Sequence, residues 1–236
     1  MTTPQGYQQF CPIALTSEIL CNRWTTLILR AFFCGATRFS DIQKSAPNMS
    51  SATLSSRLRQ LEQAGIIKRR PGQTSGASEY GLTESGRALF PILDEMGTWA
   101  QQWLRREIVA DENLDPDVLF WELRQLTLLR GDRRKTRRVA SFLLDGVPQK
   151  KRTYWIVFEP EDIEVCVKDP GHEVDIAITA HIRTLVEIWL GHVSLGAALE
   201  RGAITLDGSA SEIKAFSTWF MLSHFSKVGL NKHPRK

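Results

Sequence analysis

The side chains whose types and spacing best suit a chemical task lie between Ser50 and Ala64. Leu54, Leu58 and Leu61 recur at intervals of four and three, so they share one face of a helix and should point into a core. The opposite face carries small, polar or basic residues and no acid: Ala52, Thr53, Ser56, Arg59 and Gln60. Small residues let a helix backbone enter a major groove, and the polar ones offer donors and acceptors to base edges. The stretch therefore predicts a helix that reads double-stranded DNA.

Further residues around this helix suit contacts with DNA phosphates. Ser50 and Ser51 stand at its expected N-terminus, where free amides and the helix dipole attract anions. Arg57 lies on the flank of the helix and is better placed for the DNA backbone than for bases. Four more basic residues are candidate phosphate contacts: Arg38, Lys68, Arg69 and Arg70. One of these arginines could enter the minor groove instead, and each of the four could also be a solvated surface charge.

The charge of the chain is unevenly distributed. Residues 1–109 hold 12 Lys and Arg against 8 Asp and Glu, whereas residues 110–236 hold 18 of each. Residues 38–70 alone hold 7 basic and 2 acidic residues. A local basic cluster beside a neutral second half is typical of a nucleic-acid reader, although a solvated face would look the same.

Other chemistry finds little support in the sequence. Ser211–Lys214 matches the S-x-x-K pattern, but the partner motifs of penicillin-recognising enzymes are missing. The five histidines show no tight pairing for a metal site. The sequence also contains no Gly-Lys-Ser/Thr loop of the kind that holds a phosphate. We therefore expect no enzyme, no cofactor and no metal.

The composition predicts a globular protein of the reducing cytosol. With 236 residues, 42% of them hydrophobic, the chain can form one large or two small domains. Its four cysteines are scattered and show no C-x-x-C spacing. The N-terminus lacks a basic-then-apolar profile, and the longest apolar-rich uncharged stretch, Ala215–Ser226, is too short to span a membrane. We expect a soluble, cytoplasmic protein without membrane contact.

The first half reads as helices followed by a hairpin and one more helix. The expected helices are Pro12–Leu20, Trp24–Phe33, Asp41–Ser45 and the capped stretch that runs to Ala64. Strand-like Ile66–Arg70 and Glu79–Leu82 flank a breaker-rich loop, residues 71–78, and predict a hairpin. A long helix should run from Thr83 to about Ile108. Its apolar stripe is wide enough to pack against a partner: Leu89, Ile92, Leu93, Met96, Trp99, Ala100 and Trp103. This order of elements is the layout of a winged helix.

A polar linker, Ala110–Asp117, separates this half from a mixed second half. The expected strands are Ser141–Leu144, Tyr154–Phe158, Ile163–Val167, Val174–Ile178 and Ala203–Asp207. The expected helices are Phe120–Leu129, His181–Leu190, Leu195–Arg201 and Ser211–Phe225. Residues in the third and fourth strands alternate in polarity, so one face of the sheet should meet solvent. The fold class is therefore α+β.

Five segments of the N-terminal half carry a recognisable pattern: Cys11–Ile13, Asn22–Arg30, Arg38–Ile42, Leu54–Ile67 and Glu79–Arg87. Over these segments the chain closely resembles the HxlR family of winged helix-turn-helix regulators. The resemblance implies a DNA-binding and dimerisation domain over residues 10–109, and a homodimer that binds a pseudo-palindromic operator. It also implies that the dimer forms through the helices Pro12–Leu20 and Leu89–Trp103.

The HxlR family also includes redox sensors that use a cysteine near the N-terminus, and Cys11 matches that position. A thiol sensor needs an exposed sulfur of low pKa, which the sequence does not reveal. Cys21 and Cys34 lie on apolar helical faces and are expected in the core.

Residues 118–228 resemble a sterol carrier protein-like domain, mainly over Thr179–Phe220. That resemblance implies an apolar tunnel for hydrophobic ligands. Candidate lining residues are Trp155, Phe158, Leu185, Trp189, Phe216, Trp219 and Phe220, with Trp121 as a further large apolar residue. The same residues could simply fill a core, which composition does not distinguish from a tunnel.

Three functional hypotheses follow. The first is a dimeric DNA-binding transcriptional regulator, controlled by a hydrophobic small molecule bound in the second half. The second is a carrier of lipids or other hydrophobic ligands whose winged helix mediates protein association. The third, an enzyme acting on a hydrophobic substrate, has no catalytic constellation to support it.

Overall fold

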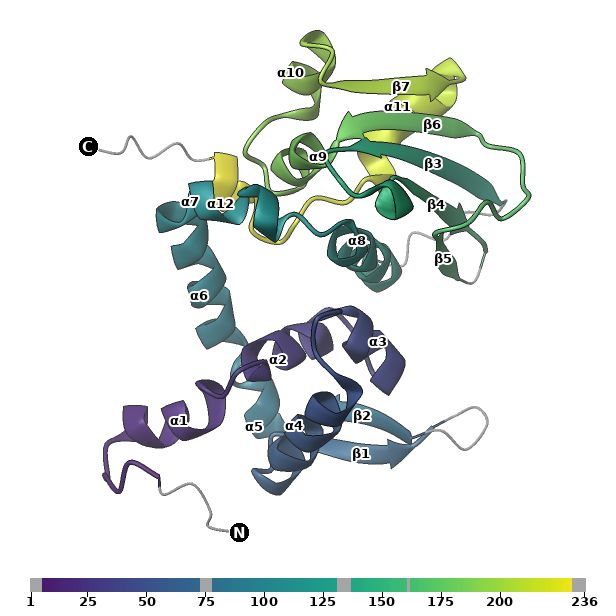
Figure 1. Ribbon diagram of the computed structural model, residues 1–236. Helices are drawn as coiled ribbons and strands as arrows, with labels where there is room; N and C mark the ends of the chain where they lie inside the picture. Colours follow the sequence, from purple (N-terminus) through teal and green to yellow (C-terminus); the bar gives the residue numbers. More distant parts are fainter. Residues whose placement is uncertain (1–5, 73–77, 131–136, 161, 231–236) are drawn as a thin grey trace. The chain divides into compact units, whose positions relative to one another are not determined.

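The chain divides into two units, Met1–Asp94 and Glu95–Lys236, and the boundary falls inside a helix. The computed structural model describes residues 6–72, 78–130, 137–160 and 162–230 (Figure 1). The division lies earlier in the chain than the linker expected after residue 109. Residues 95–109 thus group with the second unit by their contacts.

The first unit combines short helices with a two-stranded hairpin. Its elements are α1 (Pro12–Leu20), α2 (Thr25–Phe33), α3 (Phe39–Lys44), α4 (Ser51–Gln63), β1 (Ile67–Pro71), β2 (Ser78–Leu82), α5 (Glu84–Arg87) and the first turn of α6 (Phe90–Trp103). The two strands pair antiparallel, with Ile67 opposite Leu82 and Arg69 opposite Tyr80. This order confirms the predicted winged helix; residues 73–77 of the expected wing loop lie outside the described residues.

Apolar residues at helical spacing build the core of the first unit. Ile28 and Leu29 of α2, Ile42 of α3 and Leu54 of α4 are completely buried. Fully burying such a side chain stabilises a fold by about 1.5–3 kcal/mol. Short helices like these are marginal alone, so packing rather than intrinsic propensity holds them in place.

The turn between α1 and α2 depends on three consecutive side chains. Asn22 closes α1 by donating from Nδ2 to the carbonyl oxygen of Glu18 at 2.6 Å. The guanidinium of Arg23 lies 4.8 Å from the centroid of the Trp24 ring. Trp24 has a left-handed backbone, with φ at 79°, which is rare for a bulky residue. Because Trp24 is not helical, α2 begins one residue later than expected.

The prediction of one long helix over Thr83–Ile108 is wrong, because the chain forms α5, α6 and α7 (Arg105–Ile108) instead. Pro91 explains the first break. It has no N–H to donate to the carbonyl of Arg87, and its ring would clash with that carbonyl in a continuous helix. Leu104, with φ −115° and ψ 29°, separates α6 from α7.

The second unit is a five-stranded sheet with helices packed on one face. After α6 and α7 its elements are η1 (Asp111–Asn113), α8 (Pro116–Arg130), β3 (Arg138–Asp145), η2 (Gln149–Lys151), β4 (Thr153–Phe158), β5 (Ile163–Cys166), β6 (Ile176–His181), α9 (Ile182–Trp189), α10 (Leu195–Glu200), β7 (Ile204–Gly208), α11 (Ala210–Trp219) and α12 (Ser226–Leu230). The strand order is β5-β4-β3-β6-β7. Neighbouring strands are antiparallel except β3 and β6. A mixed α+β architecture is confirmed.

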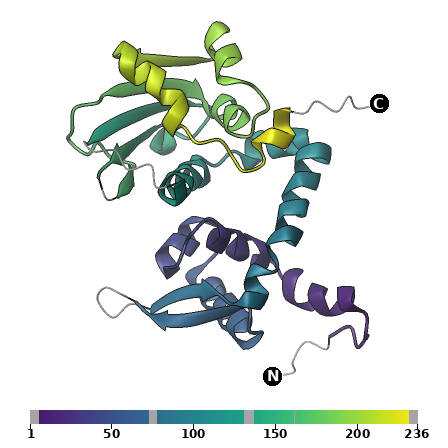
Figure 2. The same cartoon turned by 180° about the vertical axis from the view of Figure 1, so that it is seen from behind.

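One face of this sheet forms the core. On β6, Ile176, Ile178 and Ala180 are buried, whereas Thr179 and His181 on the other face are exposed. Helices α8, α9 and α11 add buried residues to the same core: Phe120, Leu185 and Phe216. Figure 2 shows α11 lying across the sheet. The predicted alternation, with one face toward solvent, is confirmed for this strand.

The expected closing helix over Ser211–Phe225 is also wrong, because α11 ends at Trp219. Phe220 leaves helical geometry with a ψ of 86°. The chain then runs back to α9, where the backbone N–H of Ser223 donates to the carbonyl of Trp189 at 2.8 Å. This tertiary contact replaces the last helical turns.

The C-terminal half of α6 is tied to the loop after α9 by hydrogen bonds. Gln101 is buried, and its Oε1 accepts from Nε2 of His192 at 2.7 Å. Its Nε2 donates to the carbonyl of Leu190 at 3.4 Å. Arg105 of α7 donates to the carbonyl of His192 at 3.1 Å. Burial and the positive charge of Arg105 lower the pKa of His192 to about 4.

His192 should make the free energy of unfolding depend on pH. The imidazole has its ordinary pKa of 6.5 in the unfolded chain and a pKa of about 4 in the folded one, so the unfolded chain binds the extra proton in this window. The stabilisation is complete above pH 6.5 and is lost as the pH falls toward 4. We expect the free energy of unfolding, measured by urea denaturation, to depend less steeply on pH for His192→Gln than for the unmodified chain. Equal pH dependences would contradict the account of this buried imidazole.

Candidate nucleic-acid interface

Helix α4 has the buried face that its sequence predicts. Leu54, Leu58 and Leu61 are at most 3% exposed. Of the residues expected on the outer surface, Ala52 and Arg59 are exposed, and Ser56 is half-buried. The leucines therefore fix the rotation of the helix, and its acid-free side is turned away from the core.

The N-terminus of α4 is capped by Ser50. The Oγ of Ser50 accepts from the backbone N–H of Thr53 at 3.1 Å and lies 2.8 Å from the Thr53 Oγ1. Both residues thus serve the cap, and Ser51 is exposed in the first turn. A capped helix end still offers its first backbone N–H groups to an anion. This geometry is compatible with the predicted phosphate contact at Ser50 and Ser51, which stays a prediction.

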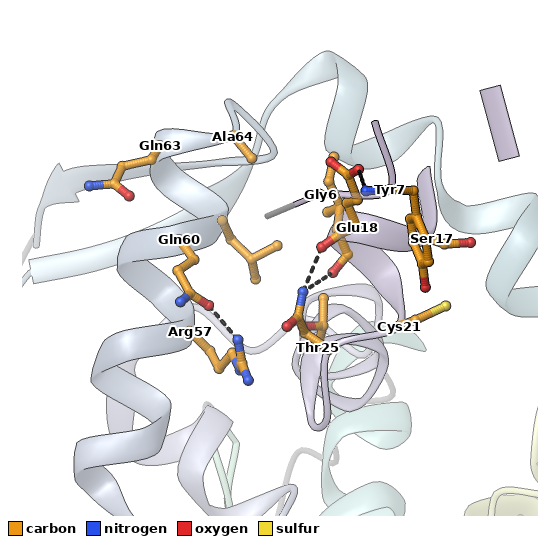
Figure 3. Close-up of a pocket in the computed structure, with 13 residues that line it drawn as sticks. Gly6, Tyr7, Ser17, Glu18, Cys21, Thr25, Arg57, Gln60, Gln63 and Ala64 are labelled. Atoms are coloured by element: carbon orange, nitrogen blue, oxygen red, sulfur yellow. Dashed lines mark hydrogen bonds between the residues drawn. The ribbon is translucent and has the colours of Figure 1, made fainter. Parts of the chain in front are cut away.

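Two of the predicted DNA contacts of α4, Arg57 and Gln60, lie on the side of the helix that faces α1; Arg57 is half-buried and Gln60 is exposed. Nη1 of Arg57 donates to Oε1 of Gln60 at 2.5 Å, and both side chains line a cavity of about 630 Å³ (Figure 3). Across the cavity lie Glu18 of α1 and Tyr7 of the segment before it. Sequence reasoning missed this cavity, because it depends on how α1 packs beside α4. No local signal in either helix reports that packing.

The three basic residues of the wing are all exposed on β1. Side chains alternate along a strand, so Lys68 and Arg70 share one face and Arg69 points to the other. Arg38 lies beside this hairpin, since it forms a backbone bridge with Glu79 of β2. Its Nε is 3.8 Å from Oε1 of Glu79, which reduces the positive charge that Arg38 presents. Of the predicted phosphate contacts, Arg38 is therefore the weakest by geometry.

The residues predicted to bind a ligand divide between two environments. Five are buried in the core of the second unit: Phe158, Leu185, Phe216, Trp219 and Phe220. Ring contacts join them, with 5.1 Å between the ring centroids of Phe158 and Trp219 and 4.9 Å between those of Phe216 and Trp219. Trp155 belongs to β4 like Phe158 but lies an odd number of residues away. Strand alternation places it on the opposite face of the sheet, so these seven residues do not line one shared interior.

The cysteines differ in exposure. Cys11 precedes α1 as its N-cap residue and is half-buried, and Cys34 is half-buried. The prediction that Cys21 lies in the core is wrong: it is exposed. It follows the last residue of α1, where the helical periodicity that suggested burial no longer applies. The redox role of Cys11 stays a prediction.

Metal-ligating clusters and membrane-spanning helices are both absent from the part of the chain that the structure describes. No group of three His, Cys, Asp or Glu residues there is arranged to hold a metal ion. None of the helices there is both long and apolar enough to cross a bilayer.

Comparison with known proteins identifies the first half of the chain. The model of the HxlR-like helix-turn-helix family matches residues 19–108. The uncharacterized HTH-type transcriptional regulator YvaP of Bacillus subtilis (strain 168) is 41% identical over 98 residues, which cover 41% of this chain and 91% of YvaP. This chain belongs to the HxlR-like helix-turn-helix family.

Other relatives match over a similar length. The uncharacterized HTH-type transcriptional regulator sll1512 of Synechocystis is 39% identical over 98 residues, covering 41% of this chain and 73% of that protein. The structure of the reduced form of the transcriptional regulator YodB from B. subtilis is 34% identical, covers 40% of this chain and 95% of YodB, and has a TM-score of 0.36. The HxlR-like match includes all of α6 and α7. Residues 109–236 lie outside it, and the sterol carrier resemblance stays a prediction.

Proposed function

We propose that this chain is a sequence-specific DNA-binding transcriptional regulator. The observation that carries the proposal is the orientation of α4, whose buried leucines turn an acid-free surface outward at a capped N-terminus. Membership of the HxlR-like helix-turn-helix family supports it, as do relatives named transcriptional regulators. The carrier hypothesis has no comparable support, because the matched relatives are named as regulators.

In this proposal the two elements of the winged helix have different tasks. Helix α4 enters the major groove by its N-terminal end, where Ala52 allows a close approach, and Arg59, two turns further along, reaches a base edge. Lys68, Arg69 and Arg70 of β1 neutralise phosphates beside the groove. The α4 contacts then supply sequence discrimination, and the β1 contacts supply affinity that depends on salt.

Two substitutions separate these tasks. Arg59→Ala should relax discrimination at one base position by about 1–3 kcal/mol, because a base contact is lost. Arg69→Ala should weaken binding to all DNA about equally and flatten the dependence of log Kd on log salt. Fluorescence anisotropy on the selected site and on single-base variants, over a range of salt, measures both effects. Arg201→Ala, an exposed arginine of the second unit, is the control. The reverse pattern for Arg59 and Arg69 would show that the roles are wrongly assigned.

We further propose a homodimer formed through α1 and α6. The outer face of α6 exposes four large apolar side chains at three-four spacing: Ile92, Met96, Trp99 and Trp103, which are 44–62% exposed. On α1, Ile13 is 77% and Leu15 is 51% exposed. A contiguous apolar helix face of this kind marks a protein contact. A second copy of this chain is the fitting occupant, because a two-fold pair presents two recognition helices to a pseudo-palindromic site.

A charge placed on the apolar face of α6 should break this dimer. Trp99→Glu buries an unpaired carboxylate in the proposed interface, so we expect monomers in sedimentation equilibrium and at least tenfold weaker operator binding. Gln102→Glu adds the same charge to an exposed polar position of the same helix and should leave the dimer intact. If the unmodified chain is already monomeric when it saturates operator DNA, this dimer does not exist.

We also propose that the second unit binds a hydrophobic effector. The indole Nε1 of Trp189 supports this proposal, because it is a buried donor without a hydrogen-bond partner among the described residues. A ligand that prefers one state of the protein would shift operator affinity by linkage.

Thermal unfolding with increasing oleate, a simple amphiphilic probe, tests the effector proposal. A ligand that binds only the folded chain should raise Tm as its concentration rises. Trp189→Phe should reduce that shift if the indole N–H donates to the ligand. Unchanged Tm and unchanged operator affinity with oleate, with sterols and with an extract of hydrophobic metabolites would remove the proposal.

A further inference from the structure

The turn between α3 and α4 is held at both ends by side chains that lie outside it. The turn runs from Ser45, which follows the last residue of α3, to Ser50, the N-cap of α4. At its start, Nη2 of Arg30 in α2 donates to the carbonyl of Ser45 at 2.8 Å. At its end, Nε2 of Gln43 in α3 donates to the carbonyl of Met49. The path of the chain into α4 therefore depends on groups that α4 does not contain.

The carbonyl of Met49 receives no donor from the helix that follows it. Intrahelical bonding begins with the carbonyl of the N-cap residue, and here the carbonyl of Ser50 accepts from the backbone N–H of Leu54 at 2.9 Å. The carbonyl of Met49 lies one residue earlier, outside this pattern. It shares a rigid peptide plane with the N–H of Ser50. By holding this carbonyl, Gln43 fixes the direction in which the chain enters α4.

The amide of Gln43 is a costly way to stabilise this turn. The side chain is half-buried, and its Oε1 is buried and accepts no hydrogen bond from the described residues. A buried acceptor without a donor costs free energy. A methionine would fill a similar space without that cost. What the glutamine supplies, and an apolar side chain does not, is the donor to Met49.

We propose that Gln43 is a positioning residue for sequence reading by α4, an inference that rests on the proposed function. The buried leucines of α4 set its rotation about its own axis, and Gln43 sets the place and angle at which its first turn begins. Hydrogen bonds to base edges weaken steeply when they are misaligned. The attraction between a basic side chain and a phosphate falls more slowly with distance. Loss of the Gln43 donor should therefore reduce discrimination between sequences more than general affinity for DNA.

Gln43→Met tests this inference, because it removes the donor and keeps the length of the side chain. We expect the ratio of the affinities for the selected operator and for random DNA to fall about tenfold. Fluorescence anisotropy measures both affinities well below Tm. Tm should change little, because the variant also removes the unsatisfied Oε1. A merely structural role would lower Tm, and loss of folded protein would reduce both affinities by the same factor and leave the ratio unchanged.

Three further variants control this test. Gln63→Met makes the same chemical change at an exposed position near the far end of α4 and should leave the ratio unchanged. Gln43→Asn keeps the amide but shortens its reach by one methylene, so it should also lower the ratio, and it serves if Gln43→Met does not fold. Gln43→Lys supplies an N–H donor at a similar reach and should restore most of the ratio. Its added charge strengthens binding to both DNAs and cancels in the ratio.

Two results would overturn the inference. One is a ratio in Gln43→Met, or in Gln43→Asn if that variant replaces it, equal to that of the unmodified chain. The other is a ratio in Gln43→Lys as low as in Gln43→Met, because the donor would then not be the group that matters.

Hydrogen exchange separates this inference from the proposed function. The backbone N–H of Thr53 is bonded to Oγ of Ser50 at 3.1 Å, at the start of α4. In Gln43→Met its exchange should become about tenfold faster, while exchange at Leu61, in the last turns of α4, stays unchanged. If the unmodified protein binds no specific DNA but exchange at Thr53 changes in this way, the regulator is refuted and Gln43 still holds the start of α4. If operator is bound selectively and exchange at Thr53 is the same in both proteins, the regulator stands and the inference about Gln43 fails.

Discussion

The burial of three leucines on α4 is the constraint on which the proposed function depends. An amphipathic surface helix buries one face, and Leu54, Leu58 and Leu61 commit α4 to a single rotation about its axis. That rotation leaves Ala52 and Arg59 exposed. The hydrogen bond that Ser50 Oγ accepts from the backbone N–H of Thr53 fixes where the helix begins, and therefore which residues form its first turn. A polar substitution at any of the three leucines would remove both the core contact and the orientation.

Helix α6 spans the boundary between the two units of the chain. The family match includes it, yet the residues after Asp94 pack with the second unit. Gln101 is hydrogen-bonded to His192, and Gly97 leaves room for the ring of Phe225, where any Cβ would clash. The same helix exposes Met96 and Trp99 on another face. If the proposed effector binds the second unit and moves α6, it would act directly on the proposed dimer contact.

The sequence was sufficient wherever structure is decided by local periodicity and capping. It predicted α1, α4, the hairpin and most strands of the second unit, because these depend on apolar spacing and turn residues. It failed where a single residue interrupts a pattern, as Pro91 in the first turn of α6 breaks the helix expected to continue from α5. It also failed where tertiary contacts decide, as at Ser223, whose bond to Trp189 replaces a helical turn. The position of Trp155 on the far face of the sheet could have been read from strand alternation.

The candidate DNA contacts also divide into those that local sequence patterns predict and those that depend on tertiary packing. The inward leucines followed from helical spacing, and the exposed basic residues of β1 followed from their charge and their place in the expected hairpin. The position of Arg57 and Gln60 beside α1, and the ion pair between Arg38 and Glu79, depend on how separate elements pack. No pattern among neighbouring residues in the sequence encodes such contacts.

Selection of bound DNA from a random pool by the full-length protein tests the central claim most directly. If α4 of each copy reads a major groove, successive rounds should enrich one sequence with two related, inverted halves. Their centres should be about one helical turn, ~10 base pairs, or a multiple of it apart. A pool that stays random while the protein remains folded and dimeric would contradict the assignment of α4 as a reader of DNA sequence.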